Sequence, residues 1–353
     1  MPIARDLSRA RYAAAQGARV AWYLGQYLLA RRISGPFDRP GEPKFKPQAP
    51  EGDQTRIRAA FLDLFARDRA NIEAGLYPAP ADMRVANALS TLRNSARFFR
   101  DLPKVDARRL QRAGTEVREA VKDGAGERYP SYYLQNFHYQ SGGWFSKEGA
   151  KLYDTQVEIL FGGAADAMRR IALGSLARAI KGTDQRRVKL LDLACGNGRF
   201  LAQILAAFPR MPATGLDLSP AYCAEARQRL AAWPQVEIVT GAAEAAPFEA
   251  ASTEAVTCVY LFHELPPRVR REVAREIARV LKPGGVFVLA DSVQSGDAPD
   301  LDRMLEYFPV GFHEPYFGSY LGEDFTALFA ESGLTHEETE LAFLTKVMRF
   351  RKA

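Results

Sequence analysis

A regular alternation of short apolar runs with helical stretches begins at about residue 186 and constrains the fold more than any other feature. Seven runs have the composition of strands: VKLLDLA (188–194), ATGLDLS (213–219), VEIVTG (236–241), AVTCVYLF (255–262), GGVFVLAD (284–291), THEETELAF (335–343) and LTKVMRFRK (344–352). Helices between the first five would make βαβ units and a parallel sheet covered on both faces. The last two runs are joined too tightly for a helix and should pair antiparallel. Residues 186–353 are therefore expected to form a doubly wound α/β domain, with a mostly parallel seven-stranded sheet and an antiparallel last strand.

Helices and a linker are expected ahead of this domain. Residues 1–34 predict one amphipathic helix, because at 3.6 residues per turn its polar and apolar residues gather on opposite sides. The polar side holds Arg5, Arg9, Gln16, Arg19 and Gln26, and the other side holds Val20, Ala21, Leu24 and Leu28. Residues 35–52 are a linker rich in proline and glycine. Residues 53–128 predict an arginine-rich helical segment, with one helix marked by Ile57, Ala60, Phe61, Leu64 and Phe65 and another by Val85, Leu89, Leu92, Ala96 and Phe99.

Charge is distributed unevenly along the chain. Residues 1–128 carry 24 Lys/Arg and 15 Asp/Glu, a net charge of +9, whereas residues 129–353 carry 24 and 27, a net charge of −3. Such a basic excess suits nucleic acid, an anionic membrane surface or acidic substrates, and it equally suits a solvated helical surface.

Composition limits the class of protein further. The chain is 47% hydrophobic and 25% charged, which is typical of a globular protein. Its best candidate for a spanning segment, residues 20–30, is far shorter than the roughly 20 residues a membrane helix needs. The first residues, MPIARDLSRARY, lack the apolar core of a secretory signal. Cys195, Cys223 and Cys258 have no zinc-type spacing, so we expect reduced thiols, no metal site and a cytoplasmic protein, either soluble or peripheral at a membrane.

A glycine-containing loop follows the first strand, and an acid ends the second. In an open α/β sheet the ligand lies beyond the carboxyl ends of the strands, where the strand order reverses. The loop of residues 194–198 belongs there, and its glycines allow a ligand to approach the backbone closely. Asp217 could accept both hydroxyls of a ribose; its alternative role is to cap the helix that begins at Pro220.

The same loop argues against a dinucleotide. The third glycine of the dinucleotide fingerprint is replaced by Leu201. Asp192 places a carboxylate beside the loop, which suits an ammonium group and repels a pyrophosphate. These features disfavour NAD and favour an aminoacyl nucleoside.

With these motifs, residues 188–291 resemble a class I S-adenosylmethionine-dependent methyltransferase. The matching segments are, in order, VKLLDLACGNGRF, ATGLDLS, VEIVTGAAEAAPF, LFHELP and ARVLKPGGVFVLAD. The resemblance is closest to the small-molecule branch that includes the ubiquinone/menaquinone C-methyltransferases. We assign it to residues 129–353, and it does not cover residues 1–125.

The resemblance implies that S-adenosylmethionine is the cofactor. Asp192 and the loop would hold its methionine part, Asp217 its ribose, and the turn of residues 241–244 its adenine. The implied cofactor-binding residues are Asp192, Ala194, Cys195, Gly196, Gly198, Asp217, Leu218, Ala243, Glu244, Tyr260 and Tyr139. The chain departs from the family at Ala194, which replaces the first loop glycine, and at Ala242, which replaces an acid expected on the adenine amino group.

Three of the four histidines fall where a methyl acceptor should lie. Methyl transfer is an in-line displacement, so the enzyme positions its reactants and removes a proton from the acceptor. His263 follows the fourth strand, His313 lies in the excursion of residues 292–322, and His138 lies just before the α/β domain. Each is a candidate catalytic base, or alternatively a structural hydrogen-bonding residue. His336 is expected on the surface.

Aromatic residues gather in two segments that should face the acceptor. Residues 129–185 are interpreted as a lid with helices, because residues 129–145 are unusually aromatic and contain two adjacent glycines; core packing is the alternative. Residues 292–322 are interpreted as a substrate-side insertion. The candidate acceptor-binding residues are Trp144, Glu264, Phe312, Tyr316 and Tyr320. Such walls imply a largely apolar or aromatic acceptor.

The leading hypothesis is a methyltransferase that acts on a hydrophobic small molecule such as a quinone, a phenol or a lipid. Helix 1–34 would dock at a membrane interface, with its apolar side in the headgroup region and its arginines on anionic lipid, or would instead pack on the domain. One alternative is an RNA or protein methyltransferase that grips its substrate through Arg93, Arg97, Arg108 and Arg109, although no RNA-binding motif is recognisable. Another is a non-catalytic regulator that binds S-adenosylmethionine, which the retained histidines disfavour. The oligomeric state is not predicted.

Overall fold

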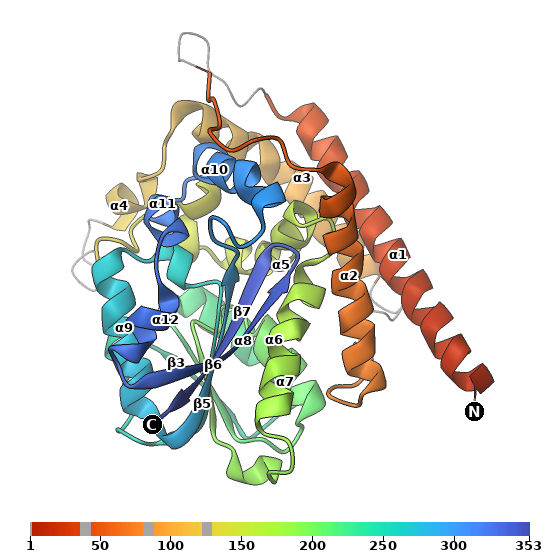
Figure 1. The fold of residues 1–353 in the computed structure, drawn as a ribbon. Helices are drawn as coiled ribbons and strands as arrows, with labels where there is room; N and C mark the ends of the chain where they lie inside the picture. Colours follow the sequence, from red (N-terminus) through yellow and green to blue (C-terminus); the bar gives the residue numbers. More distant parts are fainter. Residues whose placement is uncertain (1, 36–43, 81–87, 122–128) are drawn as a thin grey trace.

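A seven-stranded sheet forms the centre of the computed structural model, which describes residues 2–35, 44–80, 88–121 and 129–353 (Figure 1). The strand order is β3-β2-β1-β4-β5-β7-β6. The strands are β1 (Leu190–Leu193), β2 (Ala213–Asp217), β3 (Val236–Thr240), β4 (Thr253–Val259), β5 (Leu281–Ser292), β6 (Leu334–Ala342) and β7 (Thr345–Lys352). The pairs are parallel, except that β7 runs antiparallel to both β5 and β6. The predicted doubly wound fold with an antiparallel last strand is confirmed.

Helices cover both faces of the sheet, which explains why its central strands are continuously apolar. Along β5, Val286 and Val288 belong to one core, which α6 (Ala165–Ala179), α7 (Arg199–Ala207) and α8 (Pro220–Arg229) cover. Phe287 and Leu289 belong to the opposite core, under α9 (Pro267–Val280) and α12 (Phe325–Ala330). Side chains alternate between the faces along a strand, so a strand covered on both sides needs apolar residues at every position.

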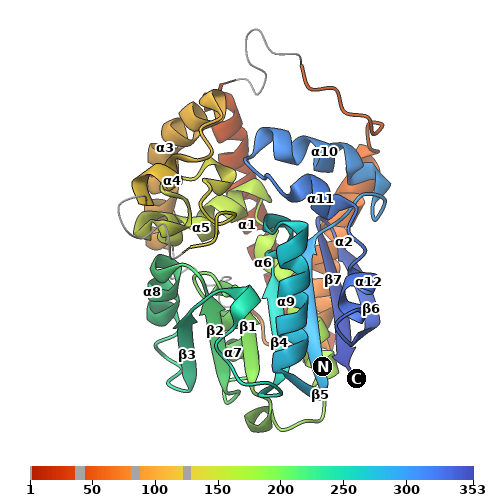
Figure 2. The same cartoon turned by 90° about the vertical axis from the view of Figure 1, so that its left-hand side faces the viewer.

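A cap of helices and turns lies over the carboxyl ends of the parallel strands (Figure 2). Its helices are α3 (Ala88–Gln111), α4 (Glu116–Val121), α5 (Lys147–Leu160), α10 (Asp302–Gly311) and α11 (Phe317–Leu321). The short turns η4 (Phe137–Tyr139) and η5 (Gly143–Phe145) belong to the same cap, and η8 (Phe262–Glu264) follows β4 directly. The segments interpreted as lid and insertion thus meet at one end of the sheet.

The two remaining helices, α1 (Pro2–Ile33) and α2 (Gln54–Glu73), lie side by side along the outside of the α/β domain (Figure 1). Asp53 caps α2, since its side chain accepts hydrogen bonds from the backbone N–H groups of Thr55 and Arg56. Within the described ranges, no helix combines the length and apolar character needed to cross a bilayer. Val85 of the predicted third helix lies outside the described residues, as do residues 36–43 of the predicted linker.

The polar side of α1, rather than its apolar side, faces the protein. Gln16 and Gln26 are buried, Arg9 pairs with Glu73 of α2, and Arg19 is almost fully buried. The opposite side exposes 40–59% of each of its large apolar residues, Leu7, Trp22, Leu24, Leu28, Leu29 and Ile33. Arg9 and Arg19 therefore bind carboxylates of the protein.

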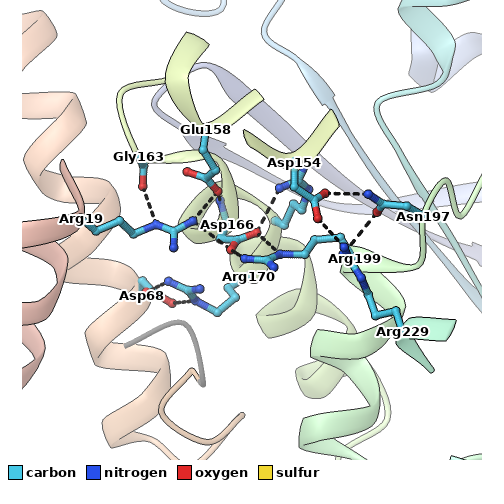
Figure 3. A network of polar contacts seen from close by, with 11 residues as sticks. Arg19, Asp68, Asp154, Glu158, Gly163, Asp166, Arg170, Asn197, Arg199 and Arg229 are labelled. Atoms are coloured by element: carbon cyan, nitrogen blue, oxygen red, sulfur yellow. Dashed lines mark hydrogen bonds and ion pairs between the residues drawn. The ribbon is translucent and has the colours of Figure 1, made fainter. Parts of the chain in front are cut away.

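A network of ion pairs ties α1 to the α/β domain (Figure 3). Buried Asp166 of α6 accepts hydrogen bonds from Arg19 (3.0 Å), from Arg169 (3.0 Å) and from Arg199 (3.1 Å). Arg19 also lies 2.6 Å from Glu158 of α5. Since Arg199 is the first residue of α7, the network reaches from the outer helix to the end of the glycine-containing loop.

A second buried pair joins α2 to the same face of the domain. Arg170 donates two hydrogen bonds, of 2.6 and 2.8 Å, to the carboxylate of Asp68. The hydroxyls of Tyr12 and Tyr77 donate to that carboxylate as well, at 2.6 and 2.8 Å. Every member is buried, so the two opposite charges compensate each other in a place that water does not reach.

Candidate functional site

A cavity that is open to solvent lies between the cap and the carboxyl ends of the strands. The strand order reverses at this edge, between β1 and β4, as expected for a ligand site in this fold. The cavity is lined by these residues of the predicted site: Trp144, Asp192, Ala194, Cys195, Gly196, Asp217, Leu218, Ala243, Tyr260 and Glu264. Residues from four separate strand ends and from the cap therefore share one cavity.

The loop after β1 is hydrogen-bonded to Asp217. Oδ2 of Asp217 accepts a hydrogen bond from the Gly196 N–H, and Oδ1 accepts one from the Ser219 N–H, both at 2.8 Å. The loop uses left-handed backbone at Gly196 (φ 55°) and also at Ala194 (φ 57°), where a side chain makes that conformation costly. Gly198 caps α7 with φ 76° and does not line the cavity.

Asp192 offers an unused hydrogen-bond acceptor in the cavity. Its Oδ1 accepts a hydrogen bond from the Thr257 hydroxyl at 2.7 Å, while buried Oδ2 has no hydrogen-bond partner among the described residues. Burial raises the pKa of Asp192 to about 7 and the pKa of Asp217 to about 6. An orphaned carboxylate oxygen of this kind fits a ligand that brings an ammonium group.

Tyr132, Tyr133 and Phe137 of the aromatic segment 129–145 also line the cavity, together with Tyr153 and Tyr222, which the sequence analysis did not single out. The ring of Trp144 lies 5.4 Å from that of Tyr222 and 5.6 Å from that of Tyr153, edge to face. Tyr222 belongs to α8, whereas the others come from the cap. The aromatic density of residues 129–145 indicated this wall, but nothing in the sequence indicated that α8 contributes to it.

The turn after β3 lies beside the cavity. Gly241 and Ala243 line it, whereas Glu244 does not. Oε1 of Glu244 accepts a hydrogen bond from the Tyr132 hydroxyl at 2.7 Å, and its buried Oε2 has no partner among the described residues. Ala242 occupies the position of the acid expected on the adenine amino group. Glu244 therefore supplies the carboxylate of this turn.

His263 is paired with an acid that the sequence analysis did not single out. Its Nδ1 lies 2.6 Å from Oδ1 of Asp291, at the end of β5, and its Nε2 lies 3.9 Å from Oε1 of Glu264. Burial alone would lower the pKa of His263, but the charge and hydrogen bond of Asp291 outweigh it and raise the pKa to about 9. Asp291 is the acid at the end of a strand, as Asp217 is, and that pattern could have revealed it.

His138 lies on the cap side of the same region. Its backbone is left-handed (φ 54°), and its ring lies about 6 Å from the rings of Trp144, Phe308 and Phe312. Its Nε2 lies 3.2 Å from Oε1 of Glu314, a fully buried acid that the sequence analysis passed over. Burial, together with the neighbouring histidines, lowers the pKa of His138 to about 3.

The other predicted residues lie around the cavity without lining it. His313 lies 2.9 Å from the side-chain oxygen of Gln135, and its ring lies 5.7 Å from that of Tyr139. Tyr320 of α11 is buried in the core, and its hydroxyl donates a hydrogen bond to the Ser292 carbonyl. His336, which was expected on the surface, is half-buried on β6, and its Nε2 lies 2.7 Å from the Thr339 hydroxyl.

Comparison with known proteins agrees with this geometry. Residues 190–285 match the family described as a methyltransferase domain. A demethylmenaquinone methyltransferase of Chlorobaculum tepidum is 32% identical over 46% of this chain and 63% of its own length. A ubiquinone/menaquinone biosynthesis C-methyltransferase of Desulfotalea psychrophila is 29% identical over 56% and 76%. A phthiotriol/phenolphthiotriol dimycocerosates methyltransferase of Mycobacterium tuberculosis is 33% identical over 36% and 46%.

The chain thus spans less than two thirds of the length of the first and third of these relatives. The matched family segment contains β1 to β4, the loop around Asp217 and the turn that carries His263. Sequence motifs, strand order and family match agree that residues 190–285 form a methyltransferase domain of the class I, S-adenosylmethionine-dependent type.

Proposed function

We propose that this chain transfers a methyl group from S-adenosylmethionine to a hydrophobic, largely aromatic small molecule or lipid. One observation carries the proposal: the orphaned carboxylate oxygen of Asp192 and an aromatic wall belong to the same cavity. A cationic amino-acid group would find its counter-charge at one end of that cavity, and an apolar acceptor would find matching surroundings at the other.

At the donor end, S-adenosylmethionine when bound supplies an electrophilic methyl group. Asp192 is proposed to hold its ammonium group, and the backbone at Gly196 to lie against its amino-acid part. Asp217 is proposed to accept its ribose hydroxyls, in addition to the two backbone N–H groups that it already binds. Aromatic faces attract a cation within about 6 Å, so the rings of Tyr133 and Tyr222 suit the positively charged donor.

At the acceptor end, we assign removal of the acceptor's proton to the neutral form of His263, which predominates only above about pH 9 because Asp291 raises the pKa of the ring. Asp291 holds Nδ1 of the ring, and Nε2 is turned toward Glu264, which lines the cavity. A base that is oriented by a buried carboxylate is a recurring catalytic arrangement. The aromatic cap excludes water from the reacting atoms while both reactants are bound.

The acceptor class follows from the cavity wall and agrees with the names of relatives. Those relatives are named for demethylmenaquinone and for phthiotriol/phenolphthiotriol dimycocerosates, which are hydrophobic molecules. The RNA alternative is less favoured, because Arg108 donates to Glu116 and to the Tyr139 carbonyl, and Arg109 pairs with Asp106. These two arginines are engaged within the protein.

We further propose that α1 docks the protein on an anionic membrane through its exposed apolar side. Trp22, Leu24 and Leu28 would enter the headgroup boundary, as the apolar side of an interfacial helix does. Exposed Arg11 and Arg32, within a segment of net charge +9, would add electrostatic attraction to anionic lipid. Docking would place the cavity near an acceptor dissolved in the bilayer.

Methyl transfer from S-adenosylmethionine labelled in its methyl group tests the proposed function. The intact protein is incubated with a total lipid extract, beside an Asp192→Asn variant. Asp192→Asn is the sharper variant, because Asp217→Ala would also release the loop that Asp217 holds. We expect a labelled lipid with the intact protein and little with the variant. Failure of the intact protein to bind S-adenosylmethionine in calorimetry, or labelling of RNA instead of lipid, contradicts the proposal.

A further inference from the structure

Three side chains that commonly bind metals converge beside the acceptor end of the cavity. His138 lies in η4, Glu264 in η8 and Glu314 in the turn between α10 and α11. One ligand atom from each lies within 4.8 Å of the other two. The three residues come from distant parts of the chain, so no local spacing pattern in the sequence reveals the cluster.

Glu314 is the member that points most directly to a ligand. Its side chain is fully buried, and neither carboxylate oxygen accepts a hydrogen bond from any described residue. Nε2 of His138, although 3.2 Å from Oε1, is not oriented to donate one. A buried carboxylate without partners is strongly unfavourable as an anion, so it either carries a proton or binds a cation.

Glu264 adds a second carboxylate whose negative charge is also unfavourable beside Glu314. Burial and the neighbouring Glu314 raise the pKa of Glu264 well above its usual range, and burial raises the pKa of Glu314 to about 8. A divalent cation between the two groups would replace their mutual repulsion by attraction. The fold thus places the buried acid Glu314 beside the partly buried acid Glu264, and a cation would stabilise both together.

The spacing is close to that of a metal site. Nitrogen and oxygen ligands lie about 2.0–2.2 Å from an ion such as zinc, so donor atoms around one ion are at most about 4.4 Å apart. Small side-chain rotations would bring the observed spread of 4.8 Å within this limit. The left-handed backbone of His138 fixes the direction from which its ring approaches the two acids.

We propose that His138, Glu264 and Glu314 bind one divalent transition-metal ion. One imidazole and two carboxylates suit Zn²⁺, Mn²⁺ or Fe²⁺, and three ligands leave positions open. An open position would hold a carbonyl or hydroxyl oxygen of the methyl acceptor, next to His263, and would make the neighbouring proton easier to remove. This use of the ion rests on the proposed function, whereas binding of the ion does not.

Separate calorimetric titrations of chelator-treated, full-length protein with Zn²⁺ and with Mn²⁺ test the site. We expect one ion per chain, bound at least about tenfold more weakly by Glu314→Gln, which keeps the shape of the side chain and removes its charge. His138→Asn should weaken binding similarly, because it removes the imidazole ligand. Asparagine tolerates left-handed backbone, so this variant should keep the local conformation. Glu331→Gln, at an exposed position, is the matched control and should bind as the intact protein does.

Folding of each variant is checked by its melting temperature and by its binding of S-adenosylmethionine. The metal site is overturned if the intact protein binds neither ion, or if Glu314→Gln and His138→Asn bind as tightly as Glu331→Gln. Unchanged methyl transfer after removal of the ion rejects the use of the ion in the reaction and leaves the proposed function standing. Binding of the ion by a protein that does not bind S-adenosylmethionine supports the metal site and rejects the proposed function.

Discussion

Asp192 is kept by the fold in surroundings that disfavour its charge. Burial raises its pKa from 3.8 to about 7, although the Thr257 hydroxyl opposes the shift. Because the folded-state pKa is the higher one, the folded protein binds this proton more tightly than the unfolded chain does. Asp192 therefore stabilises the folded state at acidic pH, and this contribution is lost as the pH rises through about 7.

Affinity for S-adenosylmethionine should depend on this titration. We expect a constant affinity above about pH 7 and a loss of up to about tenfold per pH unit below it, since protonation removes the charge opposite the ammonium group. Calorimetric titrations on both sides of this pH measure the effect. Asp192→Asn should bind weakly, with a flat profile down to about pH 6, where Asp217 titrates, and an intact protein with an equally flat profile would contradict the assignment.

The pair of His263 and Asp291 should affect turnover rather than donor binding. We expect His263→Ala to lower kcat by roughly 10²–10⁴-fold, the usual effect of losing a general base, and Asp291→Asn to lower it in the same direction. Affinity for S-adenosylmethionine should stay near that of the intact protein in both variants. A larger loss of kcat in His138→Ala or His313→Ala would contradict this assignment and would show that the base lies in the cap.

The donor end of the site was easier to predict from the sequence than the acceptor end. Asp192 and the loop that follows it are one continuous motif, and Asp217 ends the next strand. The acceptor end is assembled from residues far apart in the chain, such as His138, Glu264 and Glu314. Their proximity depends on how the cap packs, and no periodicity in the sequence records that packing.

At the scale of elements, α1 shows what an amphipathic pattern leaves open. The pattern predicts the helix, but not which side the protein binds. Glu158 and Asp166 are buried acids of the domain, and they require a cation that Arg19 supplies. Satisfying buried charge outweighed burial of leucines, so the apolar side was left outside.

Two α1 variants should separate docking from packing. Leu24 and Leu28 replaced together by Glu should abolish sedimentation with anionic liposomes and leave the melting temperature unchanged, because both are exposed. Arg19→Ala should lower the melting temperature by about 2–4 °C for each kcal/mol of stability lost and should leave sedimentation intact. Liposome binding by the intact protein should weaken with salt. Undiminished sedimentation of the double variant would contradict membrane docking.

At the scale of the whole molecule, buried polar contacts make the N-terminal helices part of the catalytic body. From the sequence, residues 1–128 were predicted to form a separate basic segment. In the structure, Asp68 and Arg170 join α2 to α6 across 102 positions of the chain. Ion pairs between distant residues leave no local signature, so their partners could not be predicted.

Substitution of Asp68 should lower the free energy of unfolding more than most single substitutions do. Asp68→Ala removes the buried carboxylate that Arg170 binds through two hydrogen bonds, and we expect the free energy of unfolding in urea to fall by about 3–5 kcal/mol. Asp63→Ala, on the same helix, breaks only an exposed pair with Arg67 and should cost less than about 1 kcal/mol. Similar small losses in both variants would show that the buried pair does not join the two parts.

The left-handed backbone near the cavity has a consequence for laboratory evolution. His138, Tyr139, Ala194 and Tyr260 all have φ between 54° and 58°, a conformation that non-glycine residues normally avoid. Each position costs roughly 1–3 kcal/mol that other contacts must offset. Selection for heat resistance alone would favour glycine there, starting with Ala194, whose side chain is smallest. Selection for turnover would retain the side chains, so the two regimes should drive this chain toward different residues at the same few positions.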